Sequence, residues 1–427
     1  MYLKYVTARS ASMQLRRFLS SSVDRKPLLV LGLESSADDS CASVVSSTRE
    51  ILSNVVLKQS KIHESFGGIH PLHAQEAHQR NLPLAIKLAL EEAKIKLDDL
   101  DGIAFTRGPG MYGCLSVCAG SAKALAAASG KPLIGVHHMQ AHALTPFLTA
   151  SETSPAPLFP FLTLLLSGGH TLLLLCTSPN QFRILATTHD ESIGQSFDKA
   201  ARDLEIPWEL GKGSPGAALE SFAFKPLPAT DVSQNTTEVK NYEFPIPFRN
   251  QLSFSYAGLR SALTRIITST PVSNMSLPQK QSIAKGFMVA AFKQVEEKLG
   301  MALKQIEEEE GIKVEGLVVS GGVASNTYLR TQLRKKLDQL SPDRQIPLHF
   351  PPPSLCTDNA AMIAWVGLER LKKGRIDSLE VMQKSKWGIE DCEAEFEGKS
   401  EASKLVSSPR QLLYYYYSPT TSKVVTV

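Results

Sequence analysis

The chain has 427 residues, of which 43% are apolar, enough to bury one large hydrophobic core or two smaller ones, and we expect two lobes. Its formal net charge of +4 equals the charge of Lys4, Arg9, Arg16 and Arg17, so the remainder is close to neutral and gives no argument for or against a nucleic-acid partner. No apolar run approaches the roughly 18 residues that a membrane-spanning helix needs, so we expect no membrane association.

The N-terminus has the composition of a targeting segment. Its first 23 residues contain four basic residues, no acidic residue, and several serines interleaved with apolar side chains. This is typical of a mitochondrial transit peptide, which is removed from the mature protein. We therefore predict that residues 1–26 direct the protein to the mitochondrial matrix and that the fold begins with an apolar strand at Leu28.

Residues 27–155 have the pattern of one α/β lobe. The segment KPLLVLGLESS predicts a buried strand, and CASVVSS predicts its hairpin partner across an acidic turn at residues 34–39. A helix is expected over residues 73–96, where apolar residues recur at helical spacing, and DGIAFTRGPG predicts the next strand. CLSVCAGSAKALAAASG predicts a helix closed by Gly130, and KPLIGVHHMQAHAL predicts a strand that becomes a helix at its histidines.

A proline-containing linker, SETSPAPLFP, precedes a second lobe expected over residues 156–372. There FLTLLLSGGHTLLLLC predicts two strands around a Ser-Gly-Gly turn, and a long helix leads to VEGLVVSGGVASN, a further strand with the same turn. Residues 222–244 are polar and aperiodic, which predicts a surface insertion. The polar residues 388–427 predict a poorly ordered tail.

The strings LTLLLSGGHT and GLVVSGGVAS resemble each other, and this is a weak internal repeat. Glycine turns at two strand ends, with the acidic turn, indicate a nucleotide or phosphate held between two related α/β lobes. The predicted fold class is therefore α/β with two lobes.

Two histidines at a spacing of four, His138 and His142, project from one face of a helix and can bind one metal ion. The same spacing also occurs on ordinary surface helices, and His137 is a less suitable first ligand because residues five apart diverge around the helix. Asp358 is a candidate third ligand, although an aspartate at a helix start equally suits an N-cap. Such a ligand set suits both zinc and iron, so the metal stays open.

The Ser-Gly-Gly turns that begin at Ser167 and Ser320 follow apolar strands. Without side chains, their backbone N–H groups can approach a phosphate, a ribose or a base, although an ordinary tight turn has the same pattern. Asp198 in SFDKAARDL can accept hydrogen bonds from ribose hydroxyls, or it can pair with Lys199 or Arg202 on a solvated face.

Nine segments together resemble, in chain order, the family of tRNA threonylcarbamoyladenosine transferases. They are LGLESSADDSC, HESFGGIHPLHAQEAHQRNL, FTRGPGMYGCLSVCAGSAKALA, GVHHMQAH, LLLSGGHT, SFDKAARDL, FSYAGLR, VVSGGVASN and CTDNAAMIA. The resemblance runs from about Leu28 to Gly367, and the transit-like N-terminus is similar to the mitochondrial branch. It implies an actin-like ATPase fold, in which two ribonuclease H-like lobes enclose an active-site cleft.

The resemblance also implies which residues act. Three of them match the family's ligands for one divalent metal ion per subunit, zinc or iron: His138, His142 and Asp358. Others match its substrate-binding residues: Leu165, Leu166, Ser167, Gly168, Gly169, Asp198 and Asn326. The family's Pro-Gly-Gly type turn is replaced here by GKGSPGAALE, in which Gly213 or Gly216 is the expected contact.

The implied reaction moves a threonylcarbamoyl group from threonylcarbamoyl-AMP, supplied by a separate synthase, to N6 of an adenosine in tRNA. Mitochondrial members are expected to work as homodimers, without the multi-protein complex of their relatives. Four arginines are candidate RNA contacts, although each equally suits an ordinary ion pair: Arg80, Arg107, Arg249 and Arg260.

Three other functions compete with this one. ATP hydrolysis or sugar phosphorylation, on the same fold, would use Asp38 and Asp39 around magnesium. A metalloprotease is disfavoured because Met139 follows His138, where a His-Glu-x-x-His protease needs a glutamate base. A non-catalytic scaffold is disfavoured because the matched metal ligands are all present.

Overall fold

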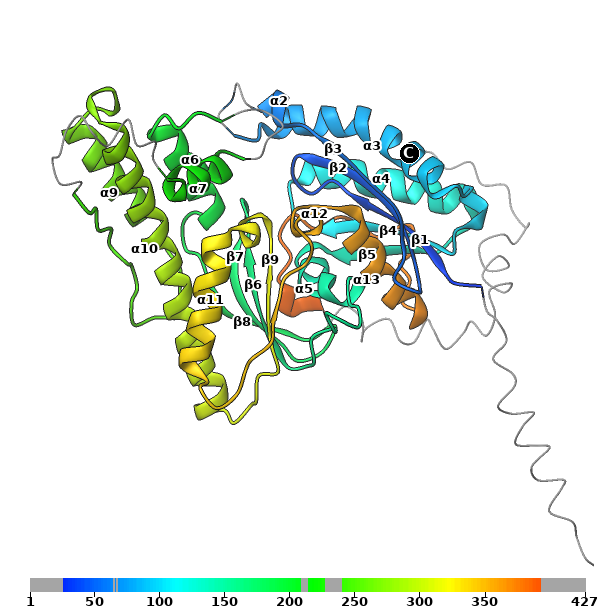
Figure 1. Cartoon of the computed structure of the whole chain (residues 1–427). Coiled ribbons are helices and arrows are strands. Elements are labelled where there is room, and N and C mark those ends of the chain that lie inside the picture. Colours follow the sequence, from blue (N-terminus) through cyan, green and yellow to red (C-terminus); the bar gives the residue numbers. More distant parts are fainter. Residues whose placement is uncertain (1–25, 64–65, 67, 209–213, 227–239, 393–427) are drawn as a thin grey trace, which may run out of the picture.

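The computed structural model describes residues 26–63, 66, 68–208, 214–226 and 240–392 (Figure 1). Residues 1–25 of the predicted transit peptide, residues 227–239 of the predicted insertion, Gly213 and residues 393–427 lie outside the described residues. Among the helices that are described, none is long and apolar enough to cross a membrane.

The first lobe is built on a five-stranded mixed sheet in the order β3-β2-β1-β4-β5. Its strands are β1 (Leu29–Glu34), β2 (Asp39–Ser46), β3 (Ile51–Lys58), β4 (Gly102–Gly108) and β5 (Leu133–His137). β1, β2 and β3 form an antiparallel meander, and β4 and β5 run parallel to β1. Every residue of β1 is buried, which explains why this central strand reads as a nearly continuous apolar run.

Helices cover both faces of this sheet (Figure 1). α3 (Pro71–Ala93) and α4 (Tyr112–Ser129) pack on one face, and α5 (His138–Leu148) and α13 (Ala360–Lys372) lie on the other. α4 ends at Gly130 in the left-handed conformation, as the sequence predicts. Short helical turns are α2 (Ser60–His63) and η2 (Leu97–Asp99).

The second lobe repeats the strand order of the first. Its sheet runs β8-β7-β6-β9-β10, with strands β6 (Phe161–Leu166), β7 (Thr171–Cys176), β8 (Phe182–Thr187), β9 (Leu317–Ser320) and β10 (Leu348–His349). Its first three strands form an antiparallel meander, and the last two are parallel to the first, as in the other lobe. This confirms the internal repeat and the predicted fold class, α/β with two related lobes.

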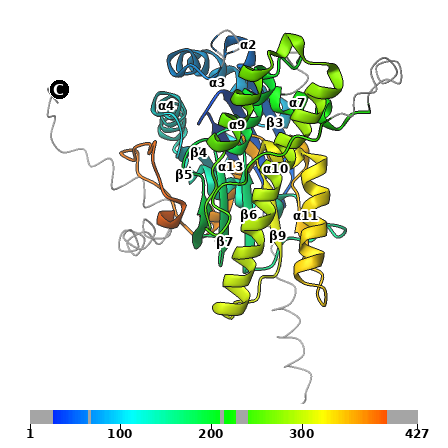
Figure 2. The ribbon, with the colours of Figure 1, turned by 90° about the vertical axis from the view of Figure 1, so that its left-hand side faces the viewer.

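The helices of the second lobe are α6 (Ile193–Asp203), α7 (Pro215–Phe224), α9 (Ala257–Ser269), α10 (Leu277–Leu303) and α11 (Thr327–Leu340). Figure 2 shows α10 and α11 side by side in front of the second sheet. Shorter turns are η3 (Val272–Asn274), η4 (Lys304–Glu309), η5 (Gly322–Ser325), α12 (Pro353–Cys356) and η6 (Ile389–Cys392). The two aromatic side chains of α10, Phe287 and Phe292, are buried in the core of this lobe.

Two parts of the chain differ from the predicted lobe boundaries. α13 lies inside the range 156–372 predicted for the second lobe, yet it packs on β1, β2 and β4 of the first sheet. Its sequence AAMIAWVGL is apolar on all sides, and such a helix is stable only where other elements enclose it. Residues 388–392, predicted as part of the tail, include η6 with Ile389 and Cys392 buried.

Gly321 offers a test of the packing between the two parallel strands of the second lobe. It adopts φ +95°, and a Cβ at this position would collide with the carbonyl oxygen of Leu166. We expect Gly321→Ala to lower the free energy of unfolding by about 1–3 kcal/mol, measured by urea denaturation. Gly322→Ala is the control, because a Cβ there meets only a methyl group of Thr357 at 3.7 Å and should leave stability nearly unchanged.

Candidate functional site

The strand β5 passes directly into α5, and His137 makes this junction. Its Nδ1 accepts the amide protons of Met139 and Gln140, at 3.2 and 3.4 Å, so His137 is the N-cap of α5. Its Nε2 donates to the carbonyl oxygen of Trp387 at 3.1 Å. Both ring nitrogens are thus used, and burial lowers the pKa of His137 to about 3. The structure therefore supports His138, not His137, as the candidate ligand.

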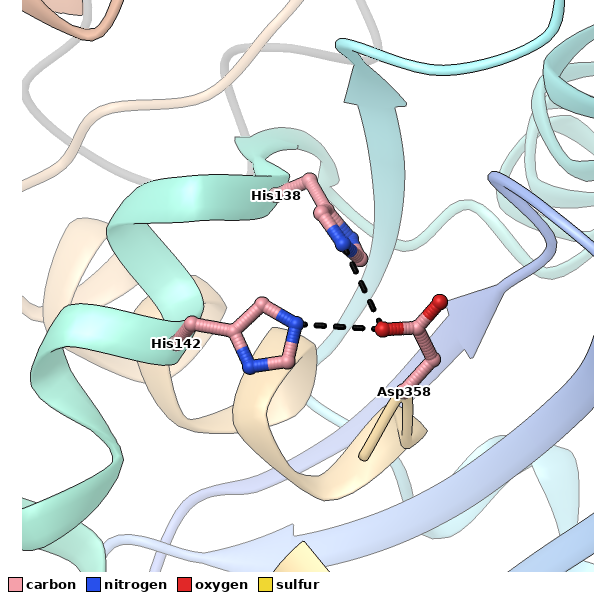
Figure 3. A group of neighbouring side chains, drawn as sticks. All are labelled: His138, His142 and Asp358. Atoms are coloured by element: carbon pink, nitrogen blue, oxygen red, sulfur yellow. Dashed lines mark hydrogen bonds and ion pairs between the residues drawn. The ribbon is translucent and has the colours of Figure 1, made fainter. Parts of the chain in front are cut away.

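Figure 3 shows His138, His142 and Asp358 pointing toward one another. The histidines lie one turn apart on α5 with their rings edge to face, and their Nε2 atoms lie 3.5 and 3.1 Å from Oδ1 of Asp358. The candidate ligand atoms all lie within 4.8 Å of one another. Asn359, not Asp358, accepts the amide proton of Met362 and caps α13, so the N-cap interpretation of Asp358 is wrong.

Glu34 stands behind His138 at the end of β1 and is fully buried. Its Oε2 accepts hydrogen bonds from Nδ1 of His138 at 3.0 Å and from the hydroxyl of Thr106 at 2.5 Å, and Oε1 accepts from the amide of Ser36. Because an ionised carboxylate only accepts, the Nδ1 atom of His138 carries a proton, and Nε2 is the ring nitrogen that faces the cluster and can bind a metal ion once its own proton is displaced. A carboxylate in this position typically orients a metal-ligating histidine.

The electrostatics of the cluster suit a divalent cation. Burial opposes the charged form of His138, but the carboxylates of Glu34 and Asp358 overcome it and raise the pKa of His138 to about 10. Burial would likewise raise the pKa of Asp358, but His138 and His142 hold it well below its usual range. The site thus stabilises positive charge among two carboxylates and two histidines, and a metal ion can supply that charge in place of a proton.

Two residues near the cluster were missed by sequence reasoning about ligands. The sequence analysis assigned Glu34 only to an acidic turn. An ionisable side chain at the end of a buried strand was the signal that could have identified it as a site residue. His170 follows the first Ser-Gly-Gly turn, and burial, then the charge of His138, lowers its pKa to about 4. A neutral imidazole therefore follows the glycine turn, near enough to the cluster for the charges of His138 and Asp358 to act on it.

The predicted substrate-binding loop begins inside the second lobe. The side chains of Leu165 and Leu166, the last residues of β6, are buried in the core, so only their backbone is available to a ligand. Gly168 and Gly169 are exposed, and a Cβ on either would meet no atom within 4 Å. The turn therefore has open space beside the α-carbons of both glycines.

Hydrogen bonds hold the turn at residues 167–169 in place. The hydroxyl of Ser167 accepts the amide protons of Gly169 and His170, at 3.2 and 3.0 Å. Ser192, the N-cap of α6, donates from its hydroxyl to the carbonyl of Gly168 at 2.6 Å. The amide of Gly194 donates to the carbonyl of Ser167 at 3.2 Å. These bonds fix the turn against the start of α6.

Asp198 and Gly216, both predicted to bind substrate, lie next to each other in the structure. Oδ1 of Asp198 accepts the amide proton of Gly216 at 2.7 Å, and burial raises the pKa of Asp198. Lys199 pairs instead with Glu191 at 2.7 Å, so the predicted alternative of an Asp198–Lys199 pair is wrong.

Asn326 is 4% exposed, and its side-chain oxygen accepts the amide proton of Leu329 at 2.9 Å, which makes it the N-cap of α11. Its contact with a nucleotide stays a prediction.

The candidate RNA-contacting arginines divide into two groups. Arg260 pairs with Asp203 at 3.0 Å, and Arg107 lies over the ring of Trp387 with 5.2 Å from its guanidinium carbon to the ring centroid. Arg80 on α3 and Arg249 in the segment before α9 are exposed. Exposure keeps the latter two available to a partner.

The chain is similar to known proteins along most of its length. The family model described as tRNA N6-adenosine threonylcarbamoyltransferase matches residues 50–365. A probable mitochondrial tRNA N6-adenosine threonylcarbamoyltransferase of Arabidopsis thaliana is 38% identical over 82% of this chain and 70% of its own length. A mitochondrial relative of the same name from Schizosaccharomyces pombe is 38% identical over 85% of this chain and 87% of its own length.

Among solved structures, component A of the (R)-2-hydroxyglutaryl-CoA dehydratase of Acidaminococcus fermentans is similar, with 13% identity and a TM-score of 0.45 over 81% of this chain and 99% of its own. The family model covers well over half of the chain, and the curated relatives cover most of it. The chain therefore belongs to the tRNA N6-adenosine threonylcarbamoyltransferase family and is a transferase.

Proposed function

We propose that this protein transfers the threonylcarbamoyl group of threonylcarbamoyl-AMP to N6 of A37, the adenosine next to the anticodon, and so forms t6A. The tRNAs are mitochondrial and read codons that begin with A. The observation that carries this proposal is the cluster of His138, His142 and Asp358, whose charges act on His170, the residue that follows an open glycine turn. Such an arrangement can hold an adenylate on the turn while its reactive end faces the cluster.

His138, His142 and Asp358 would hold one zinc or iron ion per subunit, and the bound ion supplies a positive charge that orients donor oxygens and offsets developing negative charge. Glu34 keeps the proton on Nδ1 of His138, so Nε2 stays available as a ligand atom. Asp358, whose side chain is 26% exposed against 5% or less for the two histidines, forms the open side of the cluster.

The donor is a mixed anhydride whose AMP leaving group already activates the carbamoyl carbon, so no covalent enzyme intermediate is needed. The exposed backbone of the turn at Gly168 and Gly169 binds the adenylate part of the donor. Holding donor and tRNA together makes the attack of the adenosine amine effectively unimolecular.

The partners in this proposal are tRNA, a separate synthase that supplies threonylcarbamoyl-AMP, and a second copy of the chain in a homodimer. The two eukaryotic relatives named above as mitochondrial support a mitochondrial location. We place the protein in the matrix, where mitochondrial tRNAs are found.

Gly168 allows a direct test of the loop. We expect Gly168→Ala to raise KM for threonylcarbamoyl-AMP about 10-fold, since a methyl group would fill the open space over the turn, with little change in stability. Steady-state kinetics and thermal unfolding measure the two effects. Gly120→Ala, which also adds a methyl group in open space but on α4, should leave KM unchanged. An unchanged KM in Gly168→Ala would exclude the loop from donor binding.

The reaction itself is tested by incubating protein that lacks residues 1–26 with metal, threonylcarbamoyl-AMP and an unmodified tRNA, followed by mass spectrometry of the nucleosides. We expect threonylcarbamoyl-adenosine without any added partner protein. In the ATPase alternative, magnesium would bind Asp38 and Asp39, whose pKa values burial and neighbouring carboxylates raise to about 6 and about 7. ATP hydrolysis with no modified nucleoside would favour that alternative.

A further inference from the structure

The segment from Asp377 to Cys392, here called the C-terminal clasp, follows the end of the family match at residue 365. It begins on the edge strand of the first sheet. The amide of Asp377 donates to the carbonyl of Leu133, and its carboxylate accepts the amide proton of Gly135, both at 2.8 Å. Arg370 of α13 pairs with the same carboxylate at 3.3 Å. The start of the clasp is therefore fixed to β5 and α13.

The clasp then crosses the end of β4. The amide of Lys384 donates to the carbonyl of Arg107 at 2.8 Å, and Nε of Arg107 donates to the carbonyl of Met382 at 2.8 Å. The two backbones lie so close that a Cβ on Gly108 would collide with the carbonyl of Lys384. The segment is thus a packed part of the first lobe, seen in orange beside β4 and β5 in Figure 2.

Trp387 is the central side chain of the clasp and is 8% exposed. Its ring lies 4.6 Å from the ring of His137, edge to face, and its carbonyl oxygen accepts the proton of His137 Nε2 at 3.1 Å. The cationic groups of Arg107 and Lys384 lie over the ring, at 5.2 and 5.3 Å. In the described part of the chain the indole N–H has no hydrogen-bond partner. Packing and charge, not a side-chain hydrogen bond, therefore hold this ring.

Beyond Trp387 the clasp reaches the second lobe. Oε1 of Glu390 accepts the amide proton of Ile184, on the edge strand β8, at 2.8 Å. Ile389 and Cys392 are 3% and 1% exposed and belong to the core shared by α5, α13 and the second sheet. The clasp thus contacts both sheets. Trp387, which contacts His137, lies in the clasp between the residues that contact the first sheet and those that contact the second.

We propose that the clasp, through Trp387, is a positioning element of the metal centre. His137 precedes the ligand His138 and caps the helix that also carries His142. Glu34 fixes the ring of His138 from one side, and Trp387 fixes the start of its helix from the other. A metal site needs its ligands held within about 0.5 Å and 10–20° of their working geometry, so the start of α5 cannot drift. The inference rests on the proposed metal centre.

Trp387→Ala and Trp387→Phe, made in the full-length protein, test the inference. Zinc affinity, measured by competition with a chromophoric chelator, is expected to fall by about 10–100-fold in Trp387→Ala, the range seen when a partner behind a metal ligand is removed. Trp387→Phe keeps a ring against His137 and loses no hydrogen bond, so it should retain an affinity near that of the wild type. The unfolding midpoint of each metal-free variant is measured separately.

A purely structural role predicts another pattern. Phe287→Ala, in the core of the second lobe, is the control: it should lower the unfolding midpoint without weakening zinc binding. If Trp387→Ala likewise loses stability but binds zinc as tightly as the wild type, the proposal is overturned.

Should Trp387→Ala not fold, His137→Asn gives the same test. Asparagine can still cap α5, but it lacks the Nε2 that reaches the carbonyl of Trp387. Weakened zinc binding is again expected, and wild-type affinity would contradict the proposal. If the wild-type protein itself binds neither zinc nor iron(II), both the metal centre and the positioning role are rejected. Equal zinc affinities in the wild type and the variant would reject the positioning role alone.

Discussion

Replacing His142 by alanine is expected to reduce threonylcarbamoyl transfer by about 10³-fold or more while the protein stays folded. A bound ion contributes several kcal/mol of charge stabilisation in the transition state, and each 1.4 kcal/mol corresponds to about tenfold in rate. Alanine has the highest helix propensity, so α5 should persist. Single-turnover transfer, bound metal per subunit and circular dichroism measure the three properties.

The matched control is His349→Ala, on β10 at the opposite edge of the second sheet from β8. This variant also loses one imidazole, yet it should keep its metal and its transfer rate. Full activity in a folded His142→Ala protein would remove the metal ion from the proposed chemistry.

Replacing Glu34 by alanine should damage stability and the site together. The change removes the largest of the charges that raise the pKa of His138 and leaves its buried ring with one carboxylate partner fewer. It also removes the acceptor for the hydroxyl of Thr106 and for the amide of Ser36. Breaking a buried pair by removing one partner costs about 3–5 kcal/mol. The free energy of unfolding of the metal-free protein, measured in urea, should fall by this amount.

The same variant should bind zinc about 10–100-fold more weakly, because His138 loses the acceptor that orients its ring. Glu50→Ala, which removes an exposed carboxylate from the turn between β2 and β3, should change neither quantity. A loss of stability with unchanged zinc affinity would show that Glu34 supports the fold alone.

Local pattern in the sequence predicted many of the elements of both lobes, although β3, β8, β10, α9 and α13 were not among the predicted ones. The apolar run at β1, the switch from strand to helix at His137 and His138, and the glycine that ends α4 all appear where the sequence placed them. The helix predicted at residues 73–96 is observed as Pro71–Ala93, so its ends moved by two or three residues. These features depend on side-chain periodicity and backbone conformation within about one or two turns, which neighbouring residues decide.

The sequence by itself also determined the family, through nine ordered segments, and with it the candidate ligand pair on α5. Only the tertiary structure decided that Glu34 stands behind His138, 104 positions away, and that Asp358 meets His142 across 216 positions. It also decided that α13 returns to the first sheet and that Trp387 reaches His137. The physical reason is that hydrogen bonding and burial of such distant groups depend on how whole sheets and helices pack, and no local pattern of residues records that packing.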